Sequence, residues 1–181
     1  MSNEQIAIFA GGCFWCTEPV FTQLKGVIKV EAGYIGGHTE NPTYKTISNG
    51  DTGHAEAVRI TFDAVLVSYK TLLEVFLVSH DPTTPNRQGN DIGTQYRSAV
   101  FCQNETQTEA IVKIIAQFDR DGVYDVPIVT EVNSAGQFYA GEDYHQHYFA
   151  KNPDNPYCMA VAAPKVARIR AKYTQLLKVP V

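Results

Sequence analysis

Residues 5–18 read QIAIFAGGCFWCTE, and this stretch decides how the fold begins. Its first six residues form a short apolar run that is typical of a buried strand. The two glycines that follow permit a tight turn, and residues 13–24 can then form a helix that ends at Gly26. The pattern therefore predicts a strand, a turn and a helix, with Cys13 at the turn where the helix begins.

The rest of the chain alternates between helical and strand patterns. We expect further strands at 27–35, 54–62, 98–103, 127–132 and 137–140, and helices at 68–79, 104–122, 143–150 and 164–177. Polar stretches rich in Gly and Pro at 36–53 and 82–95 predict two long loops. Hairpin-like links and crossovers both occur, so we predict an α+β fold: a two-layer α/β sandwich, ferredoxin-like, with a mixed sheet and flanking helices.

Size and charge exclude several classes of protein. The 181 residues suit one catalytic domain over 1–181, with an irregular C-terminal segment around 151–163 that carries Cys158. A net charge of -4 with scattered Lys and Arg argues against nucleic-acid binding. The N-terminus lacks a signal peptide, and no apolar run is long enough for a membrane span. We therefore expect a cytoplasmic protein that acts as a monomer without membrane attachment.

Four cysteines are too few for a disulfide scaffold, so their reactivity is of more interest. Cys13 is expected at a helix N-terminus, where backbone N–H groups favour the thiolate, and this predicts a lowered pKa. Phe14 and Trp15 would supply apolar surface beside its sulfur. The alternatives are an inert buried thiol for Cys13 and ordinary core packing for the two aromatic residues.

Four ordered motifs resemble those of the methionine sulfoxide reductase A family. They are GCFW at 12–15 followed by Glu18, GDTGHAE at 50–56, QGNDIGTQYRS at 88–98 and EDYHQ at 142–146. The resemblance spans about residues 8–158. It implies reduction of peptide methionine (S)-sulfoxide, free or in proteins, with a sulfenic acid formed on Cys13. It also implies thioredoxin as reductant, or dithiothreitol in vitro, and no bound cofactor.

Sulfoxide reduction needs a proton donor for the departing oxygen, and Glu56 suits that role. Glu56 shares the apolar side of its strand with Val58, Ile60 and Phe62, so burial should raise its pKa. The alternative is a carboxylate paired with Lys or Arg at the rim.

The resemblance implies further residues of the site. It suggests that the hydroxyls of Tyr44 and Tyr96 hold the sulfoxide oxygen and that Asp91 binds substrate or orders water. Both tyrosines could instead be half-buried core residues, and Asp91 could cap its own loop. His54 and Tyr144 lie in matched motifs, which implies a binding or supporting role.

The sequence does not predict a metal site. The pair His145 and His147 could suggest zinc, but on a helix these two side chains point to different faces, and no third ligand is evident.

Two cysteines are candidates for resolving the sulfenic acid. Most relatives carry Gly where this chain has Cys16, one helical turn from Cys13. Cys158 resembles the C-terminal recycling cysteine of many members, and a relay through both is a third possibility. Cys102, in an apolar run, is predicted to be a core residue without a redox role.

Two other functions fit parts of the sequence. A general thiol-disulfide oxidoreductase could use the Cys13-x-x-Cys16 pair, although no proline stands out as the cis-proline of such a fold. A binding module could recognise methionine sulfoxide through Phe14, Trp15 and the tyrosines without chemistry.

Overall fold

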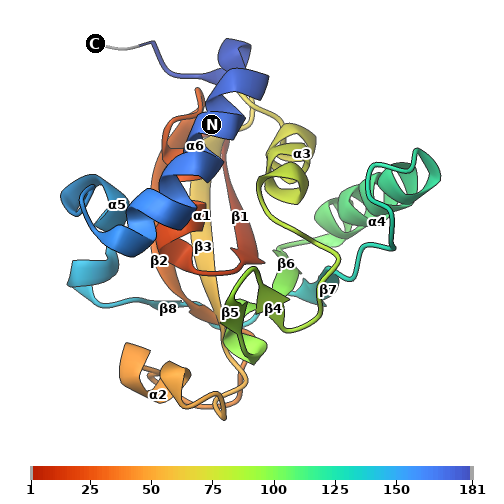
Figure 1. The fold of residues 1–181 in the computed structure, drawn as a ribbon. Helices are drawn as coiled ribbons and strands as arrows, with labels where there is room; N and C mark the ends of the chain where they lie inside the picture. Colours follow the sequence, from red (N-terminus) through yellow and green to blue (C-terminus); the bar gives the residue numbers. More distant parts are fainter. Residues whose placement is uncertain (1, 180–181) are drawn as a thin grey trace.

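A computed structural model describes residues 2–179, which contain a mixed sheet of six strands (Figure 1). The strand order is β7-β6-β1-β3-β2-β8, and neighbours are antiparallel except β6 and β7. The bounds are β1 Glu4–Gly11, β2 Val27–Ile35, β3 Ala55–Asp63, β6 Ser98–Cys102, β7 Glu131–Ser134 and β8 Tyr139–Ala140. The central order β6-β1-β3-β2, with crossover helices after β1 and β3, confirms the predicted ferredoxin-like α+β fold.

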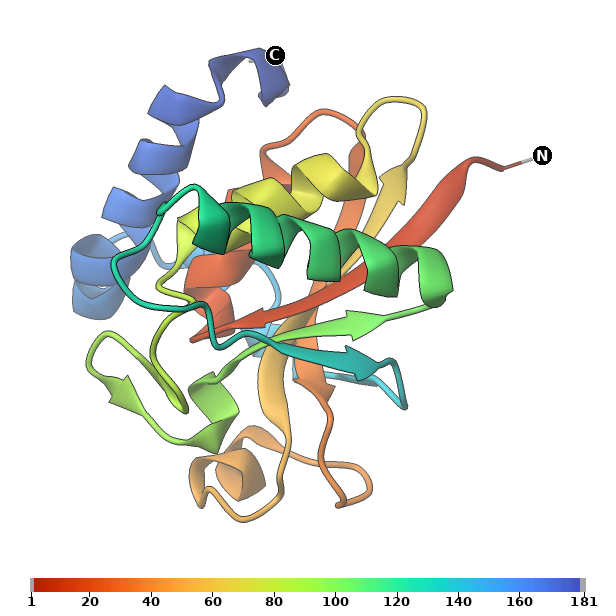
Figure 2. The same cartoon turned by 90° about the vertical axis from the view of Figure 1, so that its right-hand side faces the viewer.

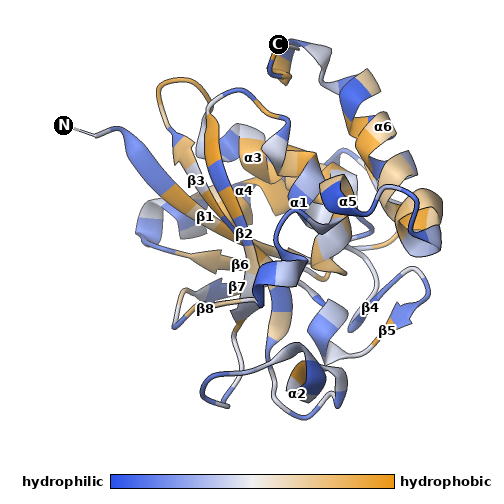
Figure 3. Cartoon of the chain, turned by 90° about the vertical axis from the view of Figure 1, so that its left-hand side faces the viewer, coloured by the Kyte–Doolittle hydropathy of each residue, from blue (hydrophilic) through white to orange (hydrophobic). Residues whose placement is uncertain are grey.

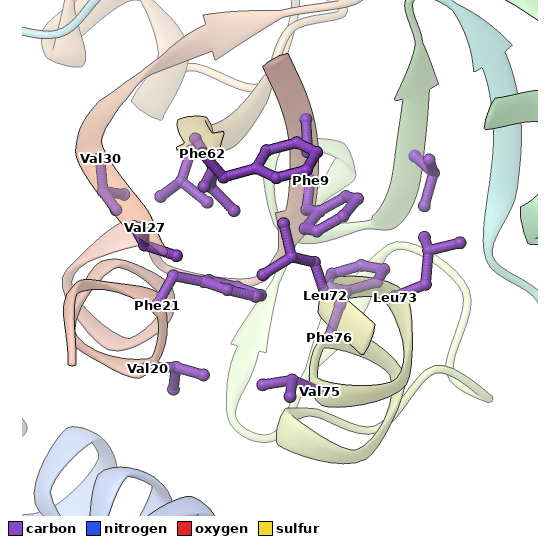
Figure 4. Packing of buried hydrophobic residues seen from close by; sticks show 14 of the residues in the cluster. Phe9, Val20, Phe21, Val27, Val30, Phe62, Leu72, Leu73, Val75 and Phe76 are labelled. Atoms are coloured by element: carbon purple, nitrogen blue, oxygen red, sulfur yellow. The ribbon is translucent and has the colours of Figure 1, made fainter. Parts of the chain in front are cut away.

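The main helices lie on one face of this sheet, as Figure 2 shows for α3 and α4. The helices are α1 Phe14–Thr22, α2 Tyr44–Ser48, α3 Tyr69–Ser79, α4 Glu105–Arg120, α5 Tyr148–Lys151 and α6 Ala163–Lys172. Between the helices and the sheet, the ring of Phe9 stacks on the ring of Phe76 with 4.8 Å between ring centroids, and its centroid lies 5.6 Å from that of Phe21 (Figure 4). Burial of such aromatic surface joins α1 and α3 to β1 and fixes the end of β1 that leads to Cys13.

The opposite face of the sheet has a smaller apolar cluster. Ile8, Ile35 and Phe101 pack there against Phe138, which comes from the segment before β8. Because both faces are covered, β1 is buried without alternation over its second half, and hydrophobic residues predominate there (Figure 3).

The two predicted long loops contain short helices and strands that their polar composition did not predict. Residues 36–53 include α2, which begins with a reciprocal capping box between Thr43 and Thr46. Residues 82–95 include the hairpin of β4 Arg87–Gln88 with β5 Asp91–Ile92, followed by the 3₁₀ turn Thr94–Tyr96. Both segments carry residues expected in the site, so these residues are held by regular structure.

The predicted irregular segment at 151–163 is wrong over most of its length. Asn155 caps a new helix, because its side-chain oxygen accepts the N–H groups of Tyr157 at 2.9 Å and Cys158 at 3.2 Å. The chain is helical from 156, passes through the π-helical turn Cys158–Ala162 and continues into α6. Cys158 is therefore on a helix, with a fully buried side chain.

Other predicted bounds near the C-terminus also need correction. The helix expected at 143–150 is split into the 3₁₀ turn Asp143–His145 and α5, and the helix expected at 164–177 ends with α6 before a 3₁₀ turn, Thr174–Leu176. The strand expected at 127–132 begins only with β7, because the N–H groups of Ile128 and Val129 bond to Asp119 and Pro82 outside the sheet. Tertiary contacts here outweigh local pattern.

Candidate active site

Cys13 lies where β1 turns into α1. Gly12 adopts a left-handed φ of 94°, and a Cβ there would lie 2.7 Å from Cγ of Gln88, so no other residue fits without strain. Cys13 is the N-cap of α1, and its carbonyl accepts the N–H groups of Cys16 at 3.0 Å and Thr17 at 3.3 Å. Cys13 is a partly buried residue, and it lies at the turn between β1 and α1.

Glu56 approaches this sulfur from β3. Its side chain is 1% exposed, and its Oε2 accepts the backbone N–H of Phe14 at 3.0 Å. Burial raises the pKa of Glu56 to about 8, and interactions with the N–H of Phe14 and with the Cys13 thiol oppose this rise. Among residues 2–179, no Lys or Arg forms a salt bridge with Glu56. The predicted upward shift is confirmed, and the alternative of a rim ion pair is wrong.

The predicted downward shift at Cys13 is wrong for the reduced protein. A hydrogen bond with Cys16, burial and the charge of Glu56 raise the pKa of the Cys13 thiol well above its usual value. The backbone N–H of Trp15, at the start of the helix, does lower the pKa of Cys13, but the three other effects are larger. The helix N-terminus thus lowers the pKa of Cys13 as expected, but Cys16, burial and Glu56 together raise it by more.

The lowered pKa belongs instead to Cys16. The hydrogen bond from Cys13 lowers the pKa of Cys16, the charge of Lys165 and a bond with Tyr157 lower it further, and burial opposes them. The Cys16 thiol lies 3.7 Å from the hydroxyl of Tyr157. Cys158 packs beside Cys16 in the same buried cluster. Cys16 is thus positioned between the partly exposed Cys13 and the buried Cys158.

The two tyrosines and Asp91 lie around Cys13 and Glu56. Burial raises the pKa of Tyr44 to about 12, with smaller contributions from the charges of Glu56 and Cys13. Burial and the same two charges raise the pKa of Tyr96. Asp91 contributes to the electrostatic field at Glu56 and at both phenols. The α2 segment, the β5 hairpin and the turn after it therefore bring neutral hydroxyls and one carboxylate to the sulfur.

Trp15 is held by aromatic residues from the C-terminal third of the chain. Its indole N–H donates to Nδ1 of His145 at 2.9 Å, and its ring stacks on Tyr148 at 3.7 Å. Phe14 has no exposed surface and contacts His145 at 4.8 Å, so its ring supports this group from the core. Tyr144 is 53% exposed and stacks on His145 at the outer side. Trp15 and Tyr144 are thus members of this group with solvent-exposed surface.

His54 has a different position from the other predicted residues. Its Nδ1 accepts the N–H of Gly37 at 3.0 Å, and its Nε2 lies 2.8 Å from the carbonyl of Thr39. Both ring nitrogens are used within the loop that leads to α2. Of the two roles left open for His54, this geometry supports the structural one, through which His54 positions the segment carrying Tyr44.

All four cysteines are free thiols. Cys102 is buried in the main core, and burial raises its pKa, as its predicted inert role requires. Within the described range 2–179, no group of three His, Cys, Asp or Glu side chains is arranged to hold a metal ion. No helix in that range has the length and apolarity to cross a membrane.

Known proteins are similar to this chain in sequence and in fold. The model of the peptide methionine sulfoxide reductase family matches residues 5–177. A relative from Chromobacterium violaceum, "Peptide methionine sulfoxide reductase MsrA", is 53% identical over 95% of this chain and 98% of its own length. The chain belongs to this family.

Solved structures agree with that assignment. Reduced Mxr1 from Saccharomyces cerevisiae has a TM-score of 0.80 at 31% identity, covering 86% of this chain and 89% of Mxr1. Mxr1 in complex with Trx2 shares the fold with a TM-score of 0.57 at 20% identity, covering 80% of this chain and 84% of that chain. The mixed sheet with flanking helices is therefore the fold of methionine sulfoxide reductases of the A type.

Sequence reasoning missed several residues that build the site of this reductase. Glu142 accepts the N–H of Tyr44 at 3.1 Å, and buried Glu18 accepts the N–H of His147 at 3.0 Å. These bonds connect α2 and α1 to the segment that holds Trp15. Lys165 and Tyr157 were missed as well. The family motifs contain the two glutamates, but neither Lys165 nor Tyr157 has a signal in the sequence that connects it to Cys16.

Proposed function

We propose that this reductase uses Cys13 as nucleophile and Glu56 as proton donor to convert methionine (S)-sulfoxide, free or in proteins, into methionine. The observation that carries the proposal is the buried Glu56 carboxyl, with a pKa of about 8, whose Oε2 accepts the N–H of Phe14 at 3.0 Å, next to Cys13 at the turn into α1. A neutral carboxyl near pH 7 is the group that a departing oxygen needs. The matched family performs this reaction.

The first step needs one proton shared between Cys13 and Glu56. With the proton on Glu56, the Cys13 thiolate attacks the sulfoxide sulfur while the carboxyl donates the proton to the oxygen. The protonated oxygen passes from the substrate sulfur to the Cys13 sulfur while the S–O bond and the newly formed S–S bond break, so methionine leaves with its sulfur reduced and Cys13 is left as a sulfenic acid. Glu56 ends as a carboxylate. The raised pKa values of both groups suit this exchange, because neither holds its charge alone in the buried site.

Substrate positioning is assigned to the residues around that pair. The neutral hydroxyls of Tyr44 and Tyr96 donate to the sulfoxide oxygen, and Trp15 contacts the methyl group. Asp91 is a polar partner for the substrate or its water. Tyr144, at the exposed edge of the aromatic group, contacts the peptide around the methionine. Preference for the S form follows from the family.

Cys16 is the first resolving residue in this proposal. It follows Cys13 by one helical turn, and interactions with Cys13, Lys165 and Tyr157 lower the pKa of its thiol. Cys158 is fully buried beside Cys16, and burial raises its pKa. Cys158 therefore acts second, by attack on the Cys13–Cys16 disulfide. The order of the three cysteines, with Cys16 in the middle, supports a relay in that direction.

Thioredoxin is the proposed reductant, with dithiothreitol as its substitute in vitro and no bound cofactor. The match to the fold of Mxr1, which has been solved in complex with Trx2, supports this partner. All proposed residues come from one sheet and the helices packed on it, which supports a single catalytic domain acting as a monomer. Four free thiols suit a reducing compartment, and we place the enzyme in the cytoplasm.

The decisive experiment is turnover of separated S and R sulfoxide epimers of a blocked methionine, with electrons from thioredoxin. The S epimer should be reduced and the R epimer left intact. Cys13→Ser should abolish turnover, whereas Cys102→Ser, the matched control, should retain it. Measurable reduction by Cys13→Ser would remove the assignment of the nucleophile.

A second comparison tests the resolving cysteines. Cys16→Ser should lose thioredoxin-dependent turnover but keep one stoichiometric release of methionine per enzyme. Cys158→Ser should still form the Cys13–Cys16 disulfide, detected as a loss of two thiols. If Cys16→Ser retains full turnover with thioredoxin, the order proposed for the two cysteines is wrong.

A further inference from the structure

One continuous chain of hydrogen bonds leads away from Cys16. The thiol of Cys16 donates to the hydroxyl oxygen of Tyr157 at 3.7 Å, and that hydroxyl donates to Oδ2 of Asp91 at 2.5 Å. The three residues come from α1, the helical turn before α6, and β5. The phenol therefore joins a resolving thiol to a carboxylate on another part of the fold, and each donor in this chain points toward Asp91.

The charged and titratable groups around Cys16 favour loss of its proton in this direction. Cys13 faces Cys16 from the start of α1, Lys165 faces it from α6, and Cys158 packs on it from the π turn. Glu56 and Asp91 are the acidic groups within electrostatic range. Lys165 stabilises a thiolate at Cys16, whereas Cys13 and Cys158 offer weakly acidic thiols. Asp91 is the carboxylate that hydrogen bonds connect to Cys16, through the hydroxyl of Tyr157.

The phenol itself stays neutral. Burial, together with the charges of Cys13 and Cys16, raises the pKa of Tyr157, so the residue does not hold a negative charge. A neutral hydroxyl can still accept one proton and give up another in the same event. Its position is fixed by helix capping at Asn155 and by an edge contact with Trp15.

We propose that Tyr157 relays the thiol proton of Cys16 to Asp91 when Cys16 attacks the sulfenic acid on Cys13. This inference rests on the proposed function and deepens it, because it assigns a proton path to the resolving step. In one step the S–H proton moves to the oxygen of Tyr157, and the phenolic proton moves to Asp91. The product is a Cys16 thiolate that accepts a hydrogen bond from Tyr157, beside a protonated Asp91.

The resolving reaction is then balanced in atoms and electrons. The Cys16 thiolate forms a bond to the Cys13 sulfur, and the S–OH bond of the sulfenic acid breaks. The hydroxide takes the proton held by Asp91 and leaves as water, while the two sulfurs share the oxidation as a disulfide. Glu56 cannot supply this proton, because it has already given its own to the sulfoxide oxygen. The relay thus gives the second step an acid of its own.

The test separates the two steps in a single turnover. Enzyme with the Cys158→Ser substitution, so that Cys16 alone resolves, is reduced, freed of reductant and mixed with the S epimer of a blocked methionine sulfoxide. Methionine release is followed by chromatography, and disulfide formation by loss of thiols. Tyr157→Phe is compared with Tyr173→Phe, which removes a phenolic hydroxyl from a half-buried tyrosine outside the site. Phenylalanine keeps the edge contact with Trp15.

We expect Tyr157→Phe to slow disulfide formation by roughly 10²-fold, the range of a lost proton transfer, and methionine release far less. Dimedone should trap the persisting sulfenic acid in that variant. Disulfide formation in the parent enzyme should also be slower in D₂O, and Tyr157→Phe should lose this solvent isotope effect. Asp91→Asn removes the proton acceptor and also the polar partner of the substrate, so it should slow both steps, and disulfide formation more strongly than methionine release.

The outcomes separate the relay from the mechanism on which it rests. Equal rates of disulfide formation in Tyr157→Phe and the parent would overturn the relay. Equal losses in both steps would also overturn it, because they would make Tyr157 a support of the whole site. If the parent itself releases no methionine, the proposed function fails and the relay fails with it.

Discussion

Glu56→Gln is the substitution that most directly tests the proton donor. Glutamine has nearly the same shape, and its carbonyl can still accept the N–H of Phe14, which Glu56 accepts at 3.0 Å. It cannot deliver a proton to the sulfoxide oxygen. Loss of a positioned general acid costs about 10²- to 10⁴-fold in rate, and we expect kcat for methionine release to fall within that range.

The same carboxyl predicts a pH profile. With a pKa of about 8, Glu56 is about nine-tenths protonated at pH 7 and about one-tenth protonated at pH 9. Because the pKa of Cys13 is raised well above its usual value, loss of the Glu56 proton leaves the pair with the single shared proton that the first step needs. Single-turnover release should therefore rise by roughly tenfold between pH 7 and pH 9. The residual rate of Glu56→Gln should lack this rise centred near pH 8.

The assay is release of methionine from a blocked (S)-sulfoxide by pre-reduced enzyme, measured without reductant because thiol reductants themselves titrate in this range. Glu31→Gln is the matched control, since Glu31 lies on the neighbouring strand and forms ion pairs with Lys29 and Arg59 away from Cys13. Near-normal release by Glu56→Gln, or a rise near pH 8 that survives in it, would refute the reasoning and assign the proton to a tyrosine or to water.

Three further predictions concern stability and substrate positioning. Since the pKa of Glu56 rises from 4.5 in the unfolded chain to about 8 in the fold, the unfolded chain releases its proton first, and the free energy of unfolding should fall as pH rises through that window. At pH 7 this proton linkage lowers the free energy of unfolding by about 3 kcal/mol. Glu56→Gln should therefore be more stable than the parent at pH 7 when measured by urea unfolding. Equal stability of the parent at pH 5 and pH 7 would contradict this. Gly12→Ala should lose about 1–3 kcal/mol of stability and much of the activity, because its Cβ would clash with Gln88 and its backbone would be strained at a φ of 94°. Gly122→Ala is the control, since Gly122 has a φ of 63° and open space around it, and this variant should show the backbone strain alone. Trp15→Phe removes the 2.9 Å hydrogen bond from the indole N–H to buried His145, and the loss of this bond should cost about 1–3 kcal/mol of interaction free energy. We expect a higher KM for peptide sulfoxides, because the aromatic group around Trp15 is then less firmly held. An unchanged KM would count against a role for Trp15 in binding.

Some features of the site follow from local sequence. The apolar run, the two glycines and the helical pattern of residues 5–24 predict the turn that presents Cys13, and the structure has that turn. The alternation of β3 puts Glu56 on its apolar side, which predicts both burial and a raised pKa. These inferences succeed because each depends on the period of one strand or helix, and that period is visible in a few consecutive residues.

Other features depend on groups that meet only after folding. The pKa of Cys13 is the clearest case, because a neighbouring thiol, burial and Glu56 outweigh the helix N-terminus that the sequence made evident. Cys158 was expected on an irregular approach to Cys13, but the Asn155 cap places it on a buried helix next to Cys16. Tyr157 reaches Cys16 across 141 positions of sequence.

The sequence by itself determined the family, the ferredoxin-like order of elements and the identity of the nucleophile and acid to be tested. Only the tertiary structure decided which groups surround each thiol and in which direction they shift its pKa. The physical reason is one of range. Strand and helix periods are set by adjacent residues, whereas electrostatic fields and desolvation at a sulfur are sums over every segment packed around it.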